Sequence, residues 1–186
     1  ADLLYLTVDS LVAEGISPQD VQTLGIIPSL DEICRKADHD RLDAWAQAGG
    51  IVAVGNISEL SLAYLVGATA EIRSCLPAHN LACIRAMEEH GASTIWFSPE
   101  LTLAEIERIA PHAKAACGIT VMGKPRVMTS EHCILQVMNR CVHDCSRCQL
   151  RHQSFSLKNI DGKVFPIRTD IHGRSRLYDA YPLDLT

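Results

Sequence analysis

The chain has 186 residues, 47% of them hydrophobic, a length and composition that suit one domain with its own core. Its 22 Asp and Glu outnumber its 17 Lys and Arg, which excludes a generally basic nucleic-acid-binding protein. No apolar run approaches the roughly 18 residues of a membrane span, and no signal peptide is recognisable. We therefore expect a cytoplasmic protein with reduced cysteines and no membrane partner.

Short apolar runs alternate with amphipathic segments over the first two-thirds of the chain. Nearly continuous apolar runs are typical of parallel strands that are covered on both faces. The predicted strands are residues 2–8, 26–30, 51–55, 71–76, 93–98 and 118–122. We predict an α/β fold, namely a partial TIM-like (βα) barrel, because a full barrel needs about 250 residues. The chain opens directly on a strand-like run, so we also expect it to be part of a longer protein.

Helix signals occupy the segments between these runs. Asn56 with Glu59, and Thr102 with Glu105, have the spacing of capping boxes, in which side chains bind the first free amides of a helix. Ser17-Pro18 is typical of an N-cap followed by proline in the first helical turn.

The character of the sequence changes after Cys148. Asp161-Gly162 and His172-Gly173 lie between β-like runs, a pattern that predicts antiparallel hairpins. We divide the chain into a barrel portion (1–130), a cysteine-rich segment (131–152) and a β-hairpin appendage (153–186).

Four of the eight cysteines, Cys133, Cys141, Cys145 and Cys148, fall within sixteen positions. Converging thiolates usually bind a soft cation, which predicts a metal site. A four-iron cluster and zinc are both open, and so are uncoordinated thiols. Structural zinc sites commonly use two C-x2-C pairs, and only one is present here. Neither usual ferredoxin spacing is present either. The iron–sulfur cluster is the first interpretation and zinc the second.

Two further interpretations of the cysteines carry less weight. Residues 141–148 have the C-x3-C-x2-C spacing of radical S-adenosylmethionine enzymes, but this motif follows the last parallel strand, and Cys133 offers a fourth ligand. The remaining cysteines are expected to be small buried hydrophobes, and the alternative for Cys75 is a nucleophile pair with His79. These remaining cysteines are Cys34, Cys75, Cys83 and Cys117.

Polar residues follow several predicted strands, at the positions where βα barrels gather their chemistry. We predict that they line a polar pocket beside the metal. The structural alternatives are a helix cap for Asn56, a turn for Ser98, a charge at a helix N-terminus for Glu100 and a satisfied histidine for His132. The candidate catalytic residues are Asn80, Ser98, Glu100 and Glu131, and the candidate substrate-binding residues are Asn56, Lys124, Arg126 and His132.

Charge is unevenly distributed along the chain. Residues 124–176 hold 10 Lys and Arg against 4 Asp and Glu, a net charge of +6 (10 − 4), whereas residues 1–123 have a net charge of −9 (7 − 16). A solvated β surface explains this, and so does an anionic partner such as the phosphates of RNA. Neither a P-loop nor a G-x-S-x-G nor an H-E-x-x-H motif is present.

Several segments together resemble the collagenase-like peptidase family U32. They are GNISELSLA (55–63), FSPELTL (97–103), GKPRVMTSEHC (123–133), DGKVFPIR (161–168) and YDAYPLDL (178–185). The resemblance implies a barrel domain in which Cys133, Cys141, Cys145 and Cys148 hold an iron–sulfur cluster, and a pocket bordered by Asn80, Ser98 and Glu100. Relatives act in RNA-base or ubiquinone hydroxylation. The chain departs from their L-N-x-x-N pattern at Leu76–Asn80 and has a tighter cysteine spacing.

Three functions remain open from the sequence. The first is an iron–sulfur-dependent enzyme that hydroxylates RNA or a small aromatic substrate. The second is a collagenase-like peptidase, and the third is a zinc-stapled structural module without catalysis of its own. The expected partners are the substrate and the remainder of the full-length protein, and oligomer formation is open.

Overall fold

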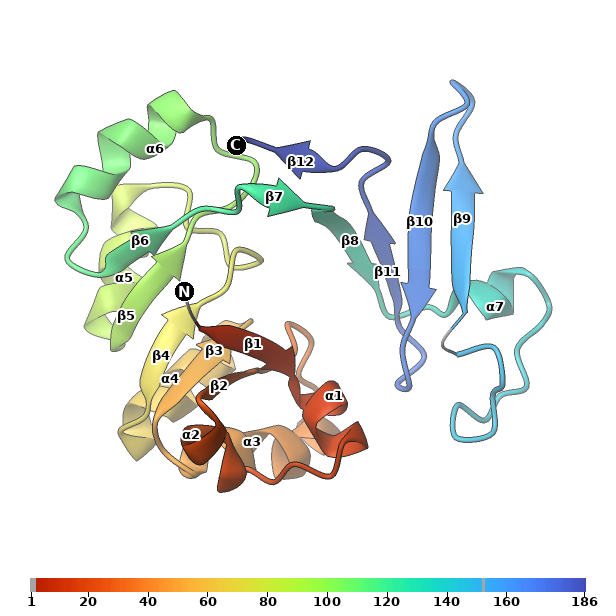
Figure 1. Ribbon diagram of the computed structural model, residues 1–186, viewed down its shortest axis with the longest axis horizontal. Helices are drawn as coiled ribbons and strands as arrows, with labels where there is room; N and C mark the ends of the chain where they lie inside the picture. Colours follow the sequence, from red (N-terminus) through yellow and green to blue (C-terminus); the bar gives the residue numbers. More distant parts are fainter. Residues whose placement is uncertain (1–2, 152) are drawn as a thin grey trace. The chain divides into compact units, whose positions relative to one another are not determined.

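The computed structural model describes residues 3–151 and 153–186. The chain forms two compact units, Ala1–Thr120 and Val121–Thr186, and each is described by itself (Figure 1). Within the described residues, no helix combines the length and the apolar composition needed to cross a membrane.

The first unit is a parallel α/β sheet whose strands follow one another in chain order, β1-β2-β3-β4-β5-β6. Helices alternate with the strands, as expected of consecutive βα units. The described strands form an open sheet with β1 and β6 at its edges, so no closed barrel is seen. The strands are β1 (Leu4–Thr7), β2 (Ile26–Ser29), β3 (Ile51–Val54), β4 (Thr69–Ile72), β5 (Ala92–Trp96) and β6 (Ala116–Gly118). The helices are α1 (Val8–Ala13), α2 (Asp20–Leu24), α3 (His39–Gln47), α4 (Ile57–Val66), α5 (Leu81–Glu89) and α6 (Leu103–Ile109), with 3-10 turns η1 (Lys36–Asp38) and η2 (Ala110–His112).

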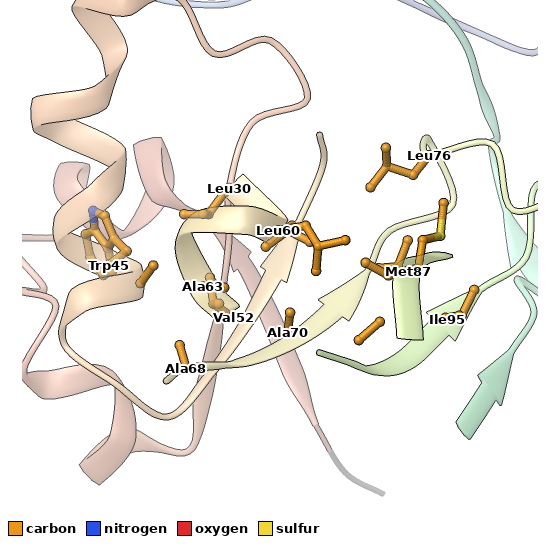
Figure 2. Packing of buried hydrophobic residues seen from close by; sticks show 14 of the residues in the cluster. Leu30, Trp45, Val52, Leu60, Ala63, Ala68, Ala70, Leu76, Met87 and Ile95 are labelled. Carbon is orange, nitrogen blue, oxygen red and sulfur yellow. The ribbon is translucent and has the colours of Figure 1, made fainter. Parts of the chain in front are cut away.

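The main core lies between the sheet and the helices. Val52 of β3 lies in it with Leu60 and Ala63 of α4, and all three side chains are buried (Figure 2). Val54 of β3 belongs to the same buried cluster. The intervening Ala53 is also buried, on the other face of the sheet. Strands that are apolar on both faces are what a covered parallel sheet requires.

The other face of the sheet is curled enough for side chains from distant strands to meet. The Tyr5 hydroxyl on β1 donates to Oε2 of Glu71 on β4 at 2.6 Å. The Tyr5 ring lies edge-on to Trp96 of β5 with 6.0 Å between centroids, and the Trp96 indole donates to the same carboxylate. Burial and the nearby Glu71 raise the pKa of Tyr5 to about 12. A flat sheet would hold β1 and β4 three strands apart, so this cluster records strong curvature.

The predicted helix caps are mostly confirmed. Asn56 caps α4 by accepting from the Glu59 amide at 3.0 Å, and Thr102 and Glu105 form a complete capping box on α6. The Glu59 side chain, however, accepts from the Gly55 amide, so only half of the Asn56 box forms. The prediction for Ser17-Pro18 was wrong, because α2 begins at Asp20 and Ser17 donates to the Asp20 carboxylate instead.

Glu59 is buried at 1% exposure, and burial raises the pKa of its carboxyl from 4.5 to about 8. Because the folded state holds the proton of Glu59 more tightly than the unfolded chain does, this group contributes its full stability below about pH 4.5. That contribution to the free energy of unfolding is lost as the pH rises from 4.5 through 8. We therefore expect the free energy of unfolding to fall by a few kcal/mol between about pH 5 and pH 9 relative to Glu59→Gln. Urea titrations followed by circular dichroism across this range measure it. Exposed Glu107→Gln is the control that should retain the wild-type slope, and equal slopes for both variants would contradict the prediction.

The second unit is antiparallel, and its sheet order is β8-β11-β10-β9. The Asp161-Gly162 and His172-Gly173 turns connect β9 to β10 and β10 to β11, which confirms both predicted hairpins. Its elements are β7 (Met122–Gly123), β8 (Arg126–Ser130), α7 (Ile134–Val137), β9 (Ser154–Lys158), β10 (Val164–Thr169), β11 (Ser175–Tyr178) and β12 (Leu183–Asp184), with β7 and β12 paired in a small ladder.

This second unit buries little apolar surface. Its buried hydrophobic residues, among those described, are Cys133, Leu135 and Ile167. Domains of this size rarely fold on so small a core without a disulfide or a metal.

Candidate functional site

The four clustered cysteines line a single pocket in the second unit. Cys133 is buried at the N-terminus of α7, and the amide after it, on Ile134, donates to Oγ of Ser175 on β11 at 2.8 Å. The other three cysteines lie on the loop between α7 and β9. The full lining is Cys133, Leu135, Cys141, Val142, Asp144, Cys145, Cys148, Arg151, Thr169, Asp170 and Gly173.

The backbone on both sides of Cys141 adopts a left-handed conformation, and one of its amides donates to the Cys141 sulfur. Asn139 and His143 both lie in the left-handed region, with φ of 52° and 56°. At His143 this conformation accompanies a hydrogen bond from its amide to Sγ of Cys141, at 3.3 Å. Left-handed backbone at residues other than glycine is strained and concentrates at functional sites and ligand clamps. Amide donors to sulfur also tune metal–thiolate centres.

The turn between β10 and β11 packs directly on Cys145. Gly173 has φ of +74°, and a Cβ atom at this position would lie 3.2 Å from Sγ of Cys145. Asp170 orders the turn, because its Oδ1 accepts from the amides of His172 and Arg174. Oδ2 of Asp170 pairs with Arg176 at 3.0 Å. Both the backbone angle and the limited space therefore favour glycine at position 173.

The four thiols also affect one another electrostatically. Burial raises the pKa of Cys145, and the nearby Cys133, Cys141 and Cys148 raise it further. Thiols that oppose each other's ionisation are stabilised as thiolates by a shared cation. Yet among the described residues no three Cys, His, Asp or Glu side chains form a ready-made metal-binding group. The four cysteines share a pocket, and the metal centre stays a prediction.

The predicted strand-end residues of the first unit include two helix caps. Asn56 caps α4, and Asn80 caps α5 by accepting from the Cys83 amide at 3.0 Å. The Asn56 amide group also donates to the carbonyl of Asp31 at 3.2 Å. These contacts give both asparagines a structural role at the carboxyl ends of β3 and β4.

Ser98 and Glu100 lie beyond the end of β5. Ser98 is buried, and its hydroxyl accepts from the Glu100 amide at 3.3 Å. Oε2 of Glu100 lies 3.3 Å from Nε2 of His79, on the loop after β4. A histidine oriented by a carboxylate is suited to proton transfer. From the sequence, His79 was predicted only as an alternative partner of Cys75, so its contact with Glu100 is new.

The remaining predicted residues belong to the second unit. Lys124 is exposed after β7, and Arg126 begins β8 opposite Tyr178 of β11. Glu131 and His132 are exposed beside Cys133, and the His132 amide donates to Oγ of Ser130 at 3.1 Å. These four residues therefore flank the cysteine pocket along the chain, whereas Asn56, Asn80, Ser98 and Glu100 belong to residues 1–120.

The comparison with protein families decides the assignment. Residues 40–167, more than half of the chain, match the model of peptidase family U32. The chain belongs to peptidase family U32. The matched range contains all four clustered cysteines and every predicted pocket residue. No curated protein and no solved structure matches the chain significantly.

Because the U32 family is named for peptidase activity, the thiols of the first unit are of interest as nucleophiles. Sγ of Cys34 lies 3.9 Å from both ring nitrogens of His39, and Nδ1 of His39 lies 3.0 Å from Oδ1 of Asp43. Burial, with nearby carboxylates such as Glu59, raises the pKa of Cys34 to about 11. The thiol is thus protonated at neutral pH, which opposes a catalytic role. Cys34, His39 and Asp43 span nine positions (43 − 34 = 9), and no motif in the sequence marks them as a group.

The expectation that all four outlying cysteines are buried was wrong. Cys75 and Cys117 are exposed, and Cys34 and Cys83 are partly exposed. Cys117 lies on β6, at the edge of the sheet, where no further described strand covers it. Cys75 lies in the loop beyond β4 and donates to the Gly55 carbonyl at 3.5 Å.

Proposed function

We propose that this U32 member binds a metal centre through Cys133, Cys141, Cys145 and Cys148. The observation that carries the proposal is that these four residues, up to 15 positions apart, line one pocket (148 − 133 = 15). The donor set fits a soft cation, because it consists of thiols and one of them already accepts an amide hydrogen bond. An iron–sulfur cluster is our first assignment and zinc our second, because only one C-x2-C pair is present.

The size of the second unit supports a tightly held centre. A sheet and a short helix that together bury so few hydrophobic residues gain stability when four ligands are joined by one ion or cluster. This argument applies equally to a purely structural zinc, which is therefore retained as the alternative function.

We further propose an enzyme that hydroxylates RNA bases or a small aromatic substrate in the cytoplasm. When bound, an iron–sulfur cluster supplies electron transfer. His79, oriented by Glu100, is the group that would accept or donate a proton at the strand ends, and the buried Ser98 fixes the backbone that presents Glu100. The curled parallel sheet supports its interpretation as part of a βα barrel, whose strand ends carry chemistry.

Basic residues of the second unit would bind the phosphates of RNA. Lys158 of β9 and Lys163 flank the β9–β10 turn and are exposed. Replacing both by glutamine should reduce the slope of log affinity against log salt by about 1.4, because each neutralised phosphate of a single strand contributes about 0.7. Fluorescence anisotropy with a labelled single-stranded RNA measures the slope. The exposed pair Arg85→Gln and Lys114→Gln, in the first unit, is the matched control, and an equal change in both would contradict the assignment.

Anaerobic purification followed by absorption spectroscopy and metal analysis tests the centre. A brown protein with iron and sulfide supports the iron–sulfur enzyme, whereas stoichiometric zinc without a chromophore supports the structural alternative. Cys117→Ser should leave the metal content unchanged, because Cys117 lies outside the pocket. Protein that binds neither metal would refute both.

Gelatin cleavage that survives replacement of all four pocket cysteines would support the peptidase alternative.

A further inference from the structure

A four-thiolate centre would place excess negative charge in this pocket. Four thiolates around a divalent ion, or around a four-iron cluster with a core charge of +2, leave a net charge of about −2. Charge in a partly buried site requires a nearby opposite charge or hydrogen bonds. The surrounding residues must therefore supply a cation.

The two carboxylates of the pocket are already engaged. Asp170 pairs with Arg176 and accepts two turn amides. Asp144 accepts from the hydroxyl and the amide of Ser146, and it lies 3.4 Å from the guanidinium of Arg147. Among the described residues that line the pocket, Arg151 is the one cationic side chain.

Arg151 is also built into the cysteine loop. Its Nη1 donates to the carbonyl of Cys145 at 3.1 Å and to that of Ser146 at 3.3 Å. Its own carbonyl accepts from the hydroxyl of Thr169 at 2.7 Å, and Thr169 is buried on β10. The Arg151 side chain thus holds the C-x2-C segment, and its backbone carbonyl joins that segment to β10. Arg151 also lines the pocket.

We infer that Arg151 is the positioning residue and the counter-charge of the four-cysteine centre. This inference rests on the proposed function, because it presupposes that the pocket takes a metal. The guanidinium fixes the loop that carries Cys145 and Cys148, and its charge offsets that of the thiolates. Both carbonyls accept from the same atom, Nη1 of Arg151. A lysine ammonium ends one bond closer to the backbone, so it supplies the charge without holding the same position.

Cobalt titration of the whole chain tests the inference without any assay of activity. Co²⁺ bound by four thiolates gives an intense sulfur-to-metal absorption band, and competition with Zn²⁺ extends the affinity range. Arg151→Gln should weaken binding by about tenfold or more, the usual effect of losing a group that supports a metal ligand. Arg151→Lys should lie between the wild type and Arg151→Gln, because it retains the charge but not the bridge.

Arg147→Gln is the matched control. Arg147 lies on the same loop between Cys145 and Cys148, carries the same charge and is exposed, but it does not line the pocket. It should change the affinity by less than about twofold. Equal losses for Arg151→Gln and Arg147→Gln would overturn the inference, as would Arg151→Lys binding as tightly as the wild type. A wild-type chain without the four-thiolate band would instead overturn the proposed function.

Discussion

Replacing Cys133 with serine should abolish the proposed metal centre and unfold residues 121–186 while the parallel sheet of residues 1–120 stays folded. Cys133 is the most buried of the four cysteines, and it joins α7 to the pocket. Structural metal binding to thiolates is worth about 10–16 kcal/mol in small domains, far more than three buried hydrophobic residues contribute. The first unit has its own large core and should not depend on the metal.

Hydrogen–deuterium exchange followed by peptide mass spectrometry gives the readout for each unit. Amides of β9, β10 and β11 should lose their protection in Cys133→Ser and after chelation of the wild type, whereas those of β3 and β4 should keep it. Cys117→Ser provides the comparison, as a free cysteine outside the pocket. Strands β9–β11 that remain protected after complete metal removal would show that the centre does not hold this unit together.

Gly173→Ala should weaken metal binding severely, by tenfold or more. Alanine at a φ of +74° costs about 1 kcal/mol or more, and its Cβ would also press on Sγ of Cys145 at 3.2 Å. The sulfur must then move away from the other three, or the turn must shift and disturb the contacts of Asp170. Metal affinity measured by competition with a chromophoric chelator, together with the melting temperature, checks this expectation.

Gly162→Ala separates the two causes. Gly162 occupies the neighbouring hairpin turn with a φ of +83°, and a Cβ atom there would meet only Cε of Lys158 at 3.7 Å. This variant carries the same backbone strain without contact with a cysteine. It should lower stability slightly and leave the metal affinity unchanged. If both glycine variants lost metal equally, strain in the hairpins rather than crowding of Cys145 would be responsible.

Strands were predicted best from the sequence, because a run of apolar residues is a local pattern. The apolar runs 26–30 and 51–55 contain β2 and β3, because buried parallel strands are apolar on both faces. The run 93–98 overlaps β5, which begins one residue earlier, at Ala92. The prediction of a strand over 71–76 was displaced, since β4 runs from Thr69 to Ile72 and the apolar residues after it lie in a loop. The run 118–122 was wrong as one strand, because it spans the boundary between the two units and contributes to both β6 and β7.

The contacts that shape the candidate site join residues far apart in the sequence, so local sequence patterns do not predict them. Grouping the four cysteines required only their spacing. His79 and Glu100 are 21 positions apart, and their contact depends on β4 and β5 being neighbours (100 − 79 = 21). Adjacent parallel strands place successive loops side by side, so the pair was accessible in principle. Gly173 meets Cys145 only through the pairing of β10 with β11, which spacing alone does not reveal.

The Tyr5–Glu71–Trp96 cluster has a practical consequence for spectroscopy. The chain has two tryptophans, Trp45 and Trp96, and both belong to residues 1–120. Intrinsic indole emission therefore originates in residues 1–120, the unit that contains the parallel sheet. Trp96 is a sensitive probe there, because it lies against the Tyr5 ring and close to a carboxylate. An unfolding curve recorded by tryptophan fluorescence would therefore follow residues 1–120, and the unfolding of residues 121–186 needs a second probe.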